Sequence, residues 1–293
     1  MMASVLPAQK KMYVWQGKTP TEFEILTVDS VTFADALPTP TPVPEPLNGV
    51  FSISATKQVQ FSCGNLQYTQ STRTWSFAAQ QYKMLGTDNV ADGALADKID
   101  LFGWSGSTGT AQWGISTSQS NADYKGNFVD WGQNIGNGTT WRTLTNDEWK
   151  YLLNTRTNAS ALKGVARINL NADGSEYANG LILLPDNWTA PDDITFKSGF
   201  STKSSSQAYA DYQTFTLEEW SQLEQAGAVF LPASGFRNSS LYLYNVQDRG
   251  YYWSATPSDS SNAYYLDFTS RNALTYEHFR YYGQAVRLVK DVK

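Results

Sequence analysis

From Tyr264 to Val289 the sequence reads YYLDFTSRNALTYEHFRYYGQAVRLV. In its first six residues a mainly apolar set of side chains alternates with a more polar set. Because successive side chains of a strand point to opposite faces of a sheet, this alternation predicts a strand with one core face and one free face. We expect the core face to carry Tyr264, Leu266 and Phe268, and the free face Tyr265, Asp267 and Thr269.

The same alternation precedes this stretch in SSLYLYNV, residues 239–246, where leucines alternate with tyrosines. Nine of the 17 tyrosines lie after residue 235, accompanied by Ser, Asn, Asp and Arg. Binding loops use this mixture, because Tyr offers a large amphipathic area at low entropy cost while Ser and Asn supply adaptable hydrogen bonds. We therefore predict one exposed binding surface formed by Tyr242, Tyr244, Tyr265, Asp267, Thr269, Arg271, Leu274, Tyr276, His278 and Tyr281.

The composition excludes several classes of function. The net charge of −5 comes from 27 acidic and 22 basic residues interspersed along the chain. Nucleic acid is therefore not an expected partner, because no basic stripe is available for a phosphate backbone. The longest apolar runs, such as GLILLP at residues 180–185, are far shorter than the roughly 18 residues of a membrane span. The single cysteine, Cys63, excludes an intrachain disulfide and a thiolate metal cluster.

The 293 residues suffice for a large domain with a small companion. The runs MYVW and FEILTVDSVTF, between residues 12 and 33, flank a Gly-Lys-Thr-Pro turn signal, which predicts a β-hairpin in an N-terminal segment of residues 1–36. Prolines then alternate with other residues, so residues 37–47 are expected to form an extended spacer. Residues 1–47 would tether a ligand-binding domain over residues 48–293 to a partner.

Two segments carry the start signals of helices. Residues 145–148 and 216–219 each read as a capping box, and a tryptophan, Trp149 or Trp220, follows each box directly. We expect two helices that these tryptophans anchor against a mixed sheet. The long stretch between residues 101 and 141 is rich in Gly, Ser and Asn and needs anchors inside a compact domain. These are predicted to be Trp104, Trp113, Trp131 and Trp141.

Several segments taken together resemble a known family: DLFGW, WRTLTNDEWKYLLNTR, GLILLPDNW, AVFLPASGFR, GYYWSATPSDSSNAYYLDF and GQAVRLV. They are similar to C-type lectin-like domains of the branch that contains the formylglycine-generating enzymes. Within that branch, they resemble the variable proteins of diversity-generating retroelements from gut bacteria and their phages. The resemblance covers about residues 49–290. It implies an α+β, C-type lectin-like fold with two helices, short mixed and antiparallel strands and long irregular loops.

In such proteins a reverse transcriptase copies a template with errors at adenines and overwrites the 3′ end of the gene. The resemblance thus implies a non-enzymatic receptor or adhesin with a fixed scaffold and a variable region at about residues 236–287. Errors in an asparagine codon produce Tyr, Ser, Asp, His, Thr, Leu and Arg, but never Glu, Gln, Lys, Met or Trp. Glu277 and Gln284 therefore fall outside the varied set. The scaffold is expected to include Trp253, Leu266, Phe268, Val286 and Arg287.

The implied ligand is an external protein or glycan, and the protein would face outward from a bacterial cell surface or a phage particle. No secretory signal peptide is expected in this sequence, because the apolar stretch near its N-terminus is short and the lysines follow that stretch. Export would then use another route or follow the removal of a signal. One alternative is a fixed adhesin or carbohydrate-binding module whose tyrosines stack on sugar rings. A more distant one is an oxidase of the formylglycine-generating kind. That enzyme uses a pair of C-terminal cysteines, whereas Cys63 is expected to be a buried small residue on a strand.

No cofactor or metal is expected, and no catalytic residue is assigned. His278 is the only histidine, which excludes His-rich metal sites and imidazole relays, and it is expected to face solvent as a contact residue. The stretch SATPSDSSN lacks the Glu-Pro-Asn or Gln-Pro-Asp element of calcium-dependent lectins. The sequence does not exclude a structural ion bound by Asp259 and Asn262.

Overall fold

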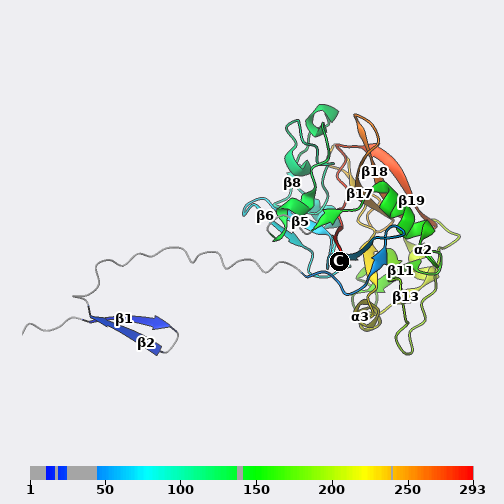
Figure 1. Ribbon diagram of the computed structural model, residues 1–293, viewed down its shortest axis with the longest axis horizontal. Helices are drawn as coiled ribbons and strands as arrows, with labels where there is room; N and C mark the ends of the chain where they lie inside the picture. Colours follow the sequence, from blue (N-terminus) through cyan, green and yellow to red (C-terminus); the bar gives the residue numbers. More distant parts are fainter. Residues whose placement is uncertain (1–10, 17–18, 25–44, 137–140, 239, 293) are drawn as a thin grey trace, which may run out of the picture. The chain divides into compact units, whose positions relative to one another are not determined.

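The computed structural model describes residues 11–16, 19–24, 45–136, 141–238 and 240–292. The chain divides into two compact units, residues 1–42 and 43–293. In the first unit, β1 (Lys11–Gln16) and β2 (Thr19–Glu24) pair antiparallel (Figure 1). A hairpin is therefore present, but its second strand begins at Thr19, within the predicted turn, and most of the run predicted as the second strand, residues 25–33, lies outside the described residues. The start of its turn and most of the predicted spacer lie outside the described residues.

The second unit begins earlier than the sequence indicates. Leu47, the last residue of the predicted spacer, donates its backbone N–H to the carbonyl oxygen of Phe61 at 2.8 Å. Its side chain packs against the largest hydrophobic core. Leu47 thus belongs to the folded unit, because it supplies both a hydrogen bond and apolar contact.

The second unit is built from small sheets. One four-stranded sheet has the order β10-β20-β4-β3 and another the order β13-β11-β12-β14, while β17-β18-β19 and β6-β5-β9 form three-stranded sheets and β7-β8 and β15-β16 form two-stranded sheets. The strands are β3 (Phe51–Ser52), β4 (Gln58–Phe61), β5 (Leu66–Thr69), β6 (Thr74–Phe77), β7 (Val90–Ala91), β8 (Ala94–Leu95), β9 (Lys98–Ile99), β10 (Arg142–Thr143), β11 (Lys163–Asn169), β12 (Tyr177–Leu183), β13 (Thr214–Phe215), β14 (Val229–Pro232), β15 (Phe236–Arg237), β16 (Leu243–Tyr244), β17 (Arg249–Pro257), β18 (Asn262–Thr269), β19 (Asn272–Phe279) and β20 (Leu288–Asp291).

The described residues contain three α-helices: α1 (Asn146–Lys150), α2 (Gln207–Tyr212) and α3 (Leu217–Gln225). A π-helical turn, η7 (Tyr151–Thr155), continues α1. Short 3-10 turns are η2 (Gly86–Asn89), η3 (Gln112–Gly114), η4 (Asn121–Tyr124) and η5 (Trp131–Asn134). Both predicted capping boxes are formed, at Thr145 and at Thr216.

The predicted fold class is wrong. Strands account for 35% of the structure and helices for 17%, so the protein is mostly β, and its described residues form several small sheets and three α-helices. An α+β, C-type lectin-like fold with two helices is not what these elements form. The physical reason is that most strands are only two to four residues long, so they form several small sheets and not one large mixed sheet.

Tryptophans anchor the structure as the sequence predicts. Trp149 and Trp220 are buried at the starts of α1 and α3. In the central stretch, Trp104, Trp131 and Trp141 are buried, while the partly buried Trp113 packs against the same core. These side chains hold a long irregular segment in place because each removes a large apolar area from water.

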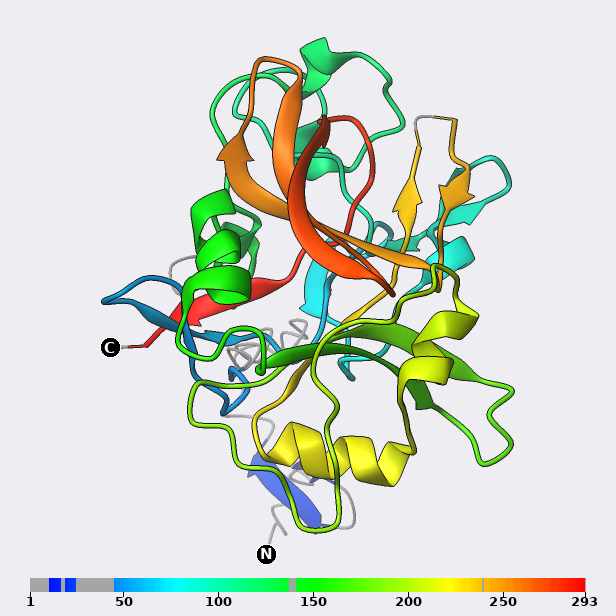
Figure 2. The same cartoon turned by 90° about the vertical axis from the view of Figure 1, so that its right-hand side faces the viewer.

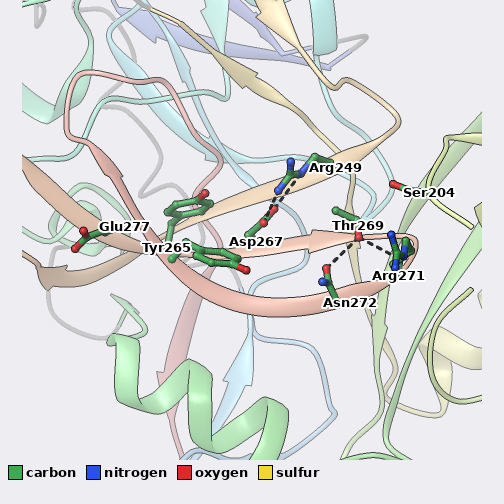
Figure 3. A pocket seen from close by; sticks show the side chains of 9 residues that line it. Ser204, Arg249, Tyr265, Asp267, Thr269, Arg271, Asn272 and Glu277 are labelled. Carbon is green, nitrogen blue, oxygen red and sulfur yellow. Dashed lines mark hydrogen bonds and ion pairs between the residues drawn. The ribbon is translucent and has the colours of Figure 1, made fainter. Parts of the chain in front are cut away.

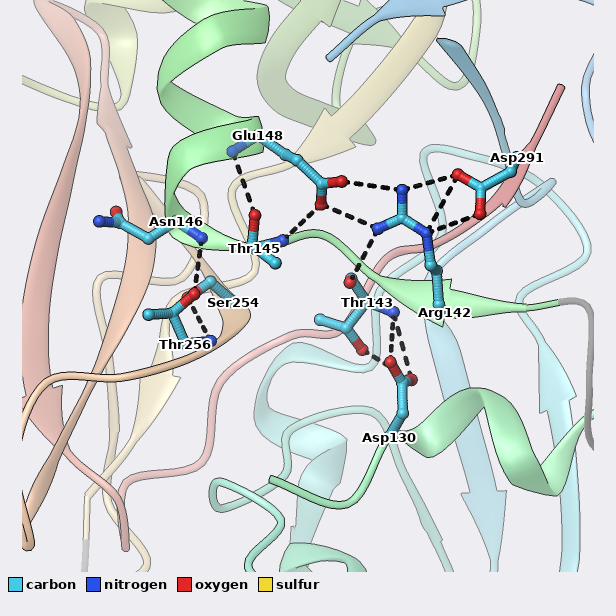
Figure 4. A network of polar contacts seen from close by, with 9 residues as sticks. All are labelled: Asp130, Arg142, Thr143, Thr145, Asn146, Glu148, Ser254, Thr256 and Asp291. Atoms are coloured by element: carbon cyan, nitrogen blue, oxygen red, sulfur yellow. Dashed lines mark hydrogen bonds and ion pairs between the residues drawn. The ribbon is translucent and has the colours of Figure 1, made fainter. Parts of the chain in front are cut away.

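A network around Arg142 ties α1 to the last strand (Figure 4). Its Nη1 donates to Oε2 of Glu148 at 2.8 Å, and its Nη2 donates to Oδ1 of Asp291 at 2.7 Å. The same Glu148 oxygen accepts the backbone N–H of Thr145 in the capping box, at 2.8 Å. One guanidinium thus joins β10, α1 and β20 and holds α1 in place. Helix α1 lies against the β17-β18-β19 sheet (Figure 2).

Candidate functional site

The β17-β18-β19 sheet has two different faces. One face carries Leu266 and Phe268, which are fully buried in the same core as residues of α1. Phe268 lies so close over Gly250 on β17 that an added Cβ would sit 2.0 Å from its ring. On the other face, Tyr265 lies opposite Tyr276, and Asp267 lies opposite Leu274. The sequence therefore predicts the assignment of side chains to faces correctly.

The prediction that Tyr265 and Asp267 are exposed is wrong, because only 5% and 2% of their surfaces are accessible. Strand β18 is the middle strand of its sheet, so both residues have neighbours on each side. Trp253 lies across from Tyr265, and Tyr251 lies across from Asp267. The second face is therefore covered along its centre and accessible along β19.

Asp267 is buried with a cationic partner. The Nη2 atom of Arg249 donates to Oδ2 of Asp267 at 2.5 Å, and its Nε donates to Oδ1 at 3.3 Å. Burial raises the pKa of the Asp267 carboxyl above its ordinary value, and the hydrogen bond and charge of Arg249 oppose that rise. The guanidinium also lies over the ring of Tyr251, 5.4 Å from its centroid.

A polar pocket of about 470 Å³ opens at this pair. Five of the predicted contact residues line it, together with residues of the neighbouring loop and strands; its lining consists of Ser204, Arg249, Tyr265, Asp267, Thr269, Arg271, Asn272, Tyr276 and Glu277. Figure 3 shows Arg271 and Glu277 at opposite ends, with the Arg249–Asp267 pair between them. The volume lies in the range of small-ligand sites.

Next to the pocket lies a group of contacting rings, called here the aromatic cluster: Phe236, Tyr244, His278, Phe279, Tyr281 and Tyr282. Phe236 stacks on Tyr244 with centroids 5.4 Å apart and contacts His278 at 5.7 Å. His278 in turn contacts Tyr282 at 4.2 Å. Tyr265, which lines the pocket, is 5.8 Å from His278. The pocket and the aromatic cluster are therefore continuous.

His278 is held in its uncharged form. Burial, together with the charge of Arg249, lowers its pKa to about 4. The ring is only partly accessible, since it lies among Phe236, Tyr265 and Tyr282. At neutral pH the residue therefore acts as an aromatic contact, and the expectation of a fully solvent-facing side chain is wrong.

The remaining predicted contact residues fall into two groups. Tyr242, Tyr244, Arg271, Leu274 and Tyr276 are exposed, and Tyr242 is the most exposed of its large hydrophobic neighbours at 67%. Thr269 and Tyr281 are partly accessible. The structure thus brings five of the ten residues to the pocket and three (Tyr244, His278 and Tyr281) to the aromatic cluster. Leu274 lies on the same sheet face as both, and Tyr242 lies directly before β16.

Some site residues are absent from the predicted set. Arg249 begins β17 and Phe236 begins β15, and each lies outside the two alternating runs. Ser204 comes from the loop before α2. Phe279 and Tyr282 lie within the run of contact-forming residues at the C-terminus, so their aromatic side chains are a sequence signal that could have identified them as contact residues.

Cys63 is placed differently from the prediction. It lies two residues after the end of β4, outside the strand, and is only partly buried. Its Sγ lies 3.7 Å from the carbonyl oxygen of Ala78, and burial raises its pKa. A thiol with a raised pKa is a poor nucleophile at neutral pH.

Within the described residues, no group of three or more His, Cys, Asp or Glu side chains is arranged to hold a metal ion. The carboxylate of Asp259 accepts hydrogen bonds from the backbone N–H groups of Ser261 and Asn262, both at 2.7 Å, and from the Asn262 amide. That carboxylate therefore closes a turn. Across the same part of the chain, no helix combines the length and the apolar character needed to cross a membrane.

Comparisons with known proteins give one family. A model described as a domain of unknown function, DUF8237, matches residues 205–289. The matched span runs from the start of α2 into β20 and contains all of the β17-β18-β19 sheet and the aromatic cluster. No curated protein and no solved structure matches the chain.

Proposed function

We propose that the protein is a non-enzymatic ligand-binding protein, and that its contact surface consists of the aromatic cluster, the pocket and the exposed side of β19. One observation carries this proposal. Of the seven large hydrophobic residues that are exposed in the described part of the chain, five lie in this region: Tyr242, Tyr244, Leu274, Tyr276 and Phe279. A monomeric protein rarely exposes such a concentration of apolar side chains unless the surface binds something.

The chemistry of the surface supports ligand binding. Its tyrosines offer large contact areas with few rotatable bonds. The rings also support one another: Phe279 and Tyr281 stack with an interplanar angle of 8° and centroids 5.2 Å apart. Side chains that are already ordered lose less entropy on binding, so this arrangement favours affinity.

The proposal includes diversification of the surface by a retroelement. The exposed positions carry Tyr, Leu, Phe and Arg, all of which arise from an asparagine codon by changes at adenine. The expected scaffold residues Trp253, Leu266, Phe268, Val286 and Arg287 are all buried. Gln284, which such changes cannot produce, is also buried. Glu277 is exposed and would be a fixed residue of the pocket.

Residues 1–42, the first unit, would tether the ligand-binding domain to a bacterial cell surface or a phage particle, and the domain would bind an external ligand. This part of the proposal rests on the sequence resemblance and on the division of the chain into two units.

Two matched libraries of the full chain test the binding surface. The first varies Tyr242, Tyr244, Leu274 and Tyr276 with codons derived from asparagine by adenine changes. The control varies, with the same codons, four exposed residues of α3: Leu217, Glu218, Gln222 and Gln225. Both libraries are displayed and selected against the same panel of purified, unrelated proteins.

The first library is expected to yield specific binders to several panel proteins, and the control library few or none. Equal yields from the two libraries, or a first library that is largely unfolded, would contradict the proposal. Folding is measured in the same display format with a conformation-dependent protease challenge, so loss of binding and loss of structure are separated.

A further inference from the structure

The pocket has a surplus of hydrogen-bond donors at one end. Arg249 uses Nε and Nη2 for Asp267, and 35% of its side chain remains accessible. A guanidinium carries five N–H donors, so its outer edge is available to a ligand. The Arg271 guanidinium is exposed and has no partner among the described residues.

Smaller donors lie at the same end. Asn272 lines the pocket and accepts a hydrogen bond from the Thr269 hydroxyl through Oδ1 at 3.0 Å, so its amide NH₂ group remains as a donor. The Ser204 hydroxyl lines the pocket beside Arg271 (Figure 3). The Arg271 backbone N–H is already used, because it donates to Thr269 Oγ1 at 3.0 Å.

The two carboxylates of the pocket do not offset this surplus. Asp267 is neutralised by Arg249 and is buried beneath it. Glu277 accepts the hydroxyl of Ser258 and lies at the far end of the pocket from Arg271 (Figure 3). The end that contains Arg271, Asn272 and Ser204, together with the outer edge of the central Arg249, is therefore positive and rich in donors. This suits a ligand group that is negative and rich in acceptors.

We infer that this end of the pocket binds a carboxylate side chain, Asp or Glu, of a protein ligand. A guanidinium fork matches the geometry of a carboxylate. A protein ligand is favoured because the pocket continues through Tyr265 into the aromatic cluster, and aromatic residues together with Arg are the side chains that dominate protein interfaces. In this arrangement Asp267 is a positioning residue that orients Arg249, while Arg249 and Arg271 touch the ligand. The inference rests on the proposed function.

The test uses the full chain labelled with ¹⁵N and two small probes, N-acetyl-glutamate amide and its uncharged isostere N-acetyl-glutamine amide. The Nε–Hε signals of Arg249 and Arg271 are followed by NMR. We expect saturable shifts with the glutamate probe at a Kd of about 1–50 mM, a range suited to one isolated ion pair in water, and none with the glutamine probe. Arg271→Gln should weaken binding at least about tenfold, whereas Arg73→Gln, which removes another exposed arginine in the β5–β6 turn, should leave it unchanged.

Three results would overturn the inference: no saturable shift, equal shifts with both probes, or binding that Arg271→Gln leaves intact. D-glucuronate serves as a further probe. If it binds at least about tenfold more tightly than the glutamate probe, the site is suited to an acidic sugar, and the inference is also overturned. If the pocket binds no carboxylate while the four-residue surface library still yields binders, the proposed function stands and only this inference fails.

Discussion

The guanidinium of Arg249, at the start of β17, reaches diagonally to the carboxylate of Asp267 on β18, with Nη2 and Oδ2 2.5 Å apart. The two partners are buried unequally, since 35% of the Arg249 side chain is accessible and only 3% of the Asp267 side chain. Removal of Arg249 and removal of Asp267 should therefore affect stability differently. Without Asp267, the guanidinium still reaches water, whereas without Arg249 a buried carboxylate has lost its counter-charge.

Arg249→Met should accordingly lower the free energy of unfolding by about 2 kcal/mol at pH 7, and Asp267→Asn by about 1 kcal/mol. The cost of Arg249→Met should shrink as the pH falls toward 4. Without Arg249, the buried Asp267 carboxyl has a higher pKa in the folded state than in the unfolded state. The folded variant therefore takes up a proton at a higher pH than the unfolded chain does, and its stability rises as the pH falls through that range. Urea unfolding at pH 7 and pH 5 measures both effects. Equal costs for the two variants, or a pH-independent cost for Arg249→Met, would contradict this account.

His278 should change the free energy of unfolding in the opposite direction as the pH falls. Its pKa is about 4 in the folded protein and 6.5 ordinarily, so below pH 6.5 the unfolded chain takes up a proton that the folded chain does not. Stability should therefore fall as the pH drops from 6.5 to 4, by up to about 2 kcal/mol after screening by water. The readout is the difference in unfolding free energy between the native chain and His278→Asn. Parallel pH profiles for the two proteins would show that His278 is not buried among the rings.

Exposed and core positions of the same sheet should respond differently to substitution. Leu274→Ser and Tyr276→Ser should change the free energy of unfolding by no more than about 0.5 kcal/mol. Leu266→Ala and Phe268→Ala should each cost about 3–5 kcal/mol, because each leaves a cavity in the core. Chemical unfolding of the four variants checks the contrast, and a large cost at Leu274 or Tyr276 would mean that β19 is covered.

The start of the second unit can be tested with two truncations. Removal of residues 1–42 should leave the thermal unfolding midpoint of the second unit unchanged. Removal of residues 1–47 should lower its stability by about 1 kcal/mol or more, since it deletes the Leu47 hydrogen bond to Phe61 and the Leu47 contact with the core. Identical midpoints for the two truncated proteins would place Leu47 in the spacer.

Local signals predict local structure well in this chain. Both capping boxes form, because the Thr hydroxyl and the Glu carboxylate that make each box are only three residues apart. Helix α2 has no capping box: the Ser205 hydroxyl accepts the backbone N–H of Ala208 at 3.1 Å, but position 208 carries alanine where the box needs Glu or Gln. The sequence therefore predicts α1 and α3 and misses α2.

The candidate site shows the same limit. Alternation along β18 correctly predicts which side chains share a face. It does not predict that β18 is a middle strand, and this position is what buries Tyr265 and Asp267. Nor does it indicate that Arg249, 18 residues away, is the partner of Asp267, because that pairing depends on the register between two strands.

The most direct test of the central claim is deep sequencing of the 3′ end of this gene, and of the DNA just downstream, across a natural population. The account predicts substitutions concentrated at the codons of Tyr242, Tyr244, Leu274 and Tyr276, constant codons for Trp253, Leu266 and Phe268, and a near-identical downstream copy with adenines at the varied sites. Invariant codons at Tyr242, Tyr244, Leu274 and Tyr276, with no downstream copy, would contradict the account and would mean that the surface is a fixed site.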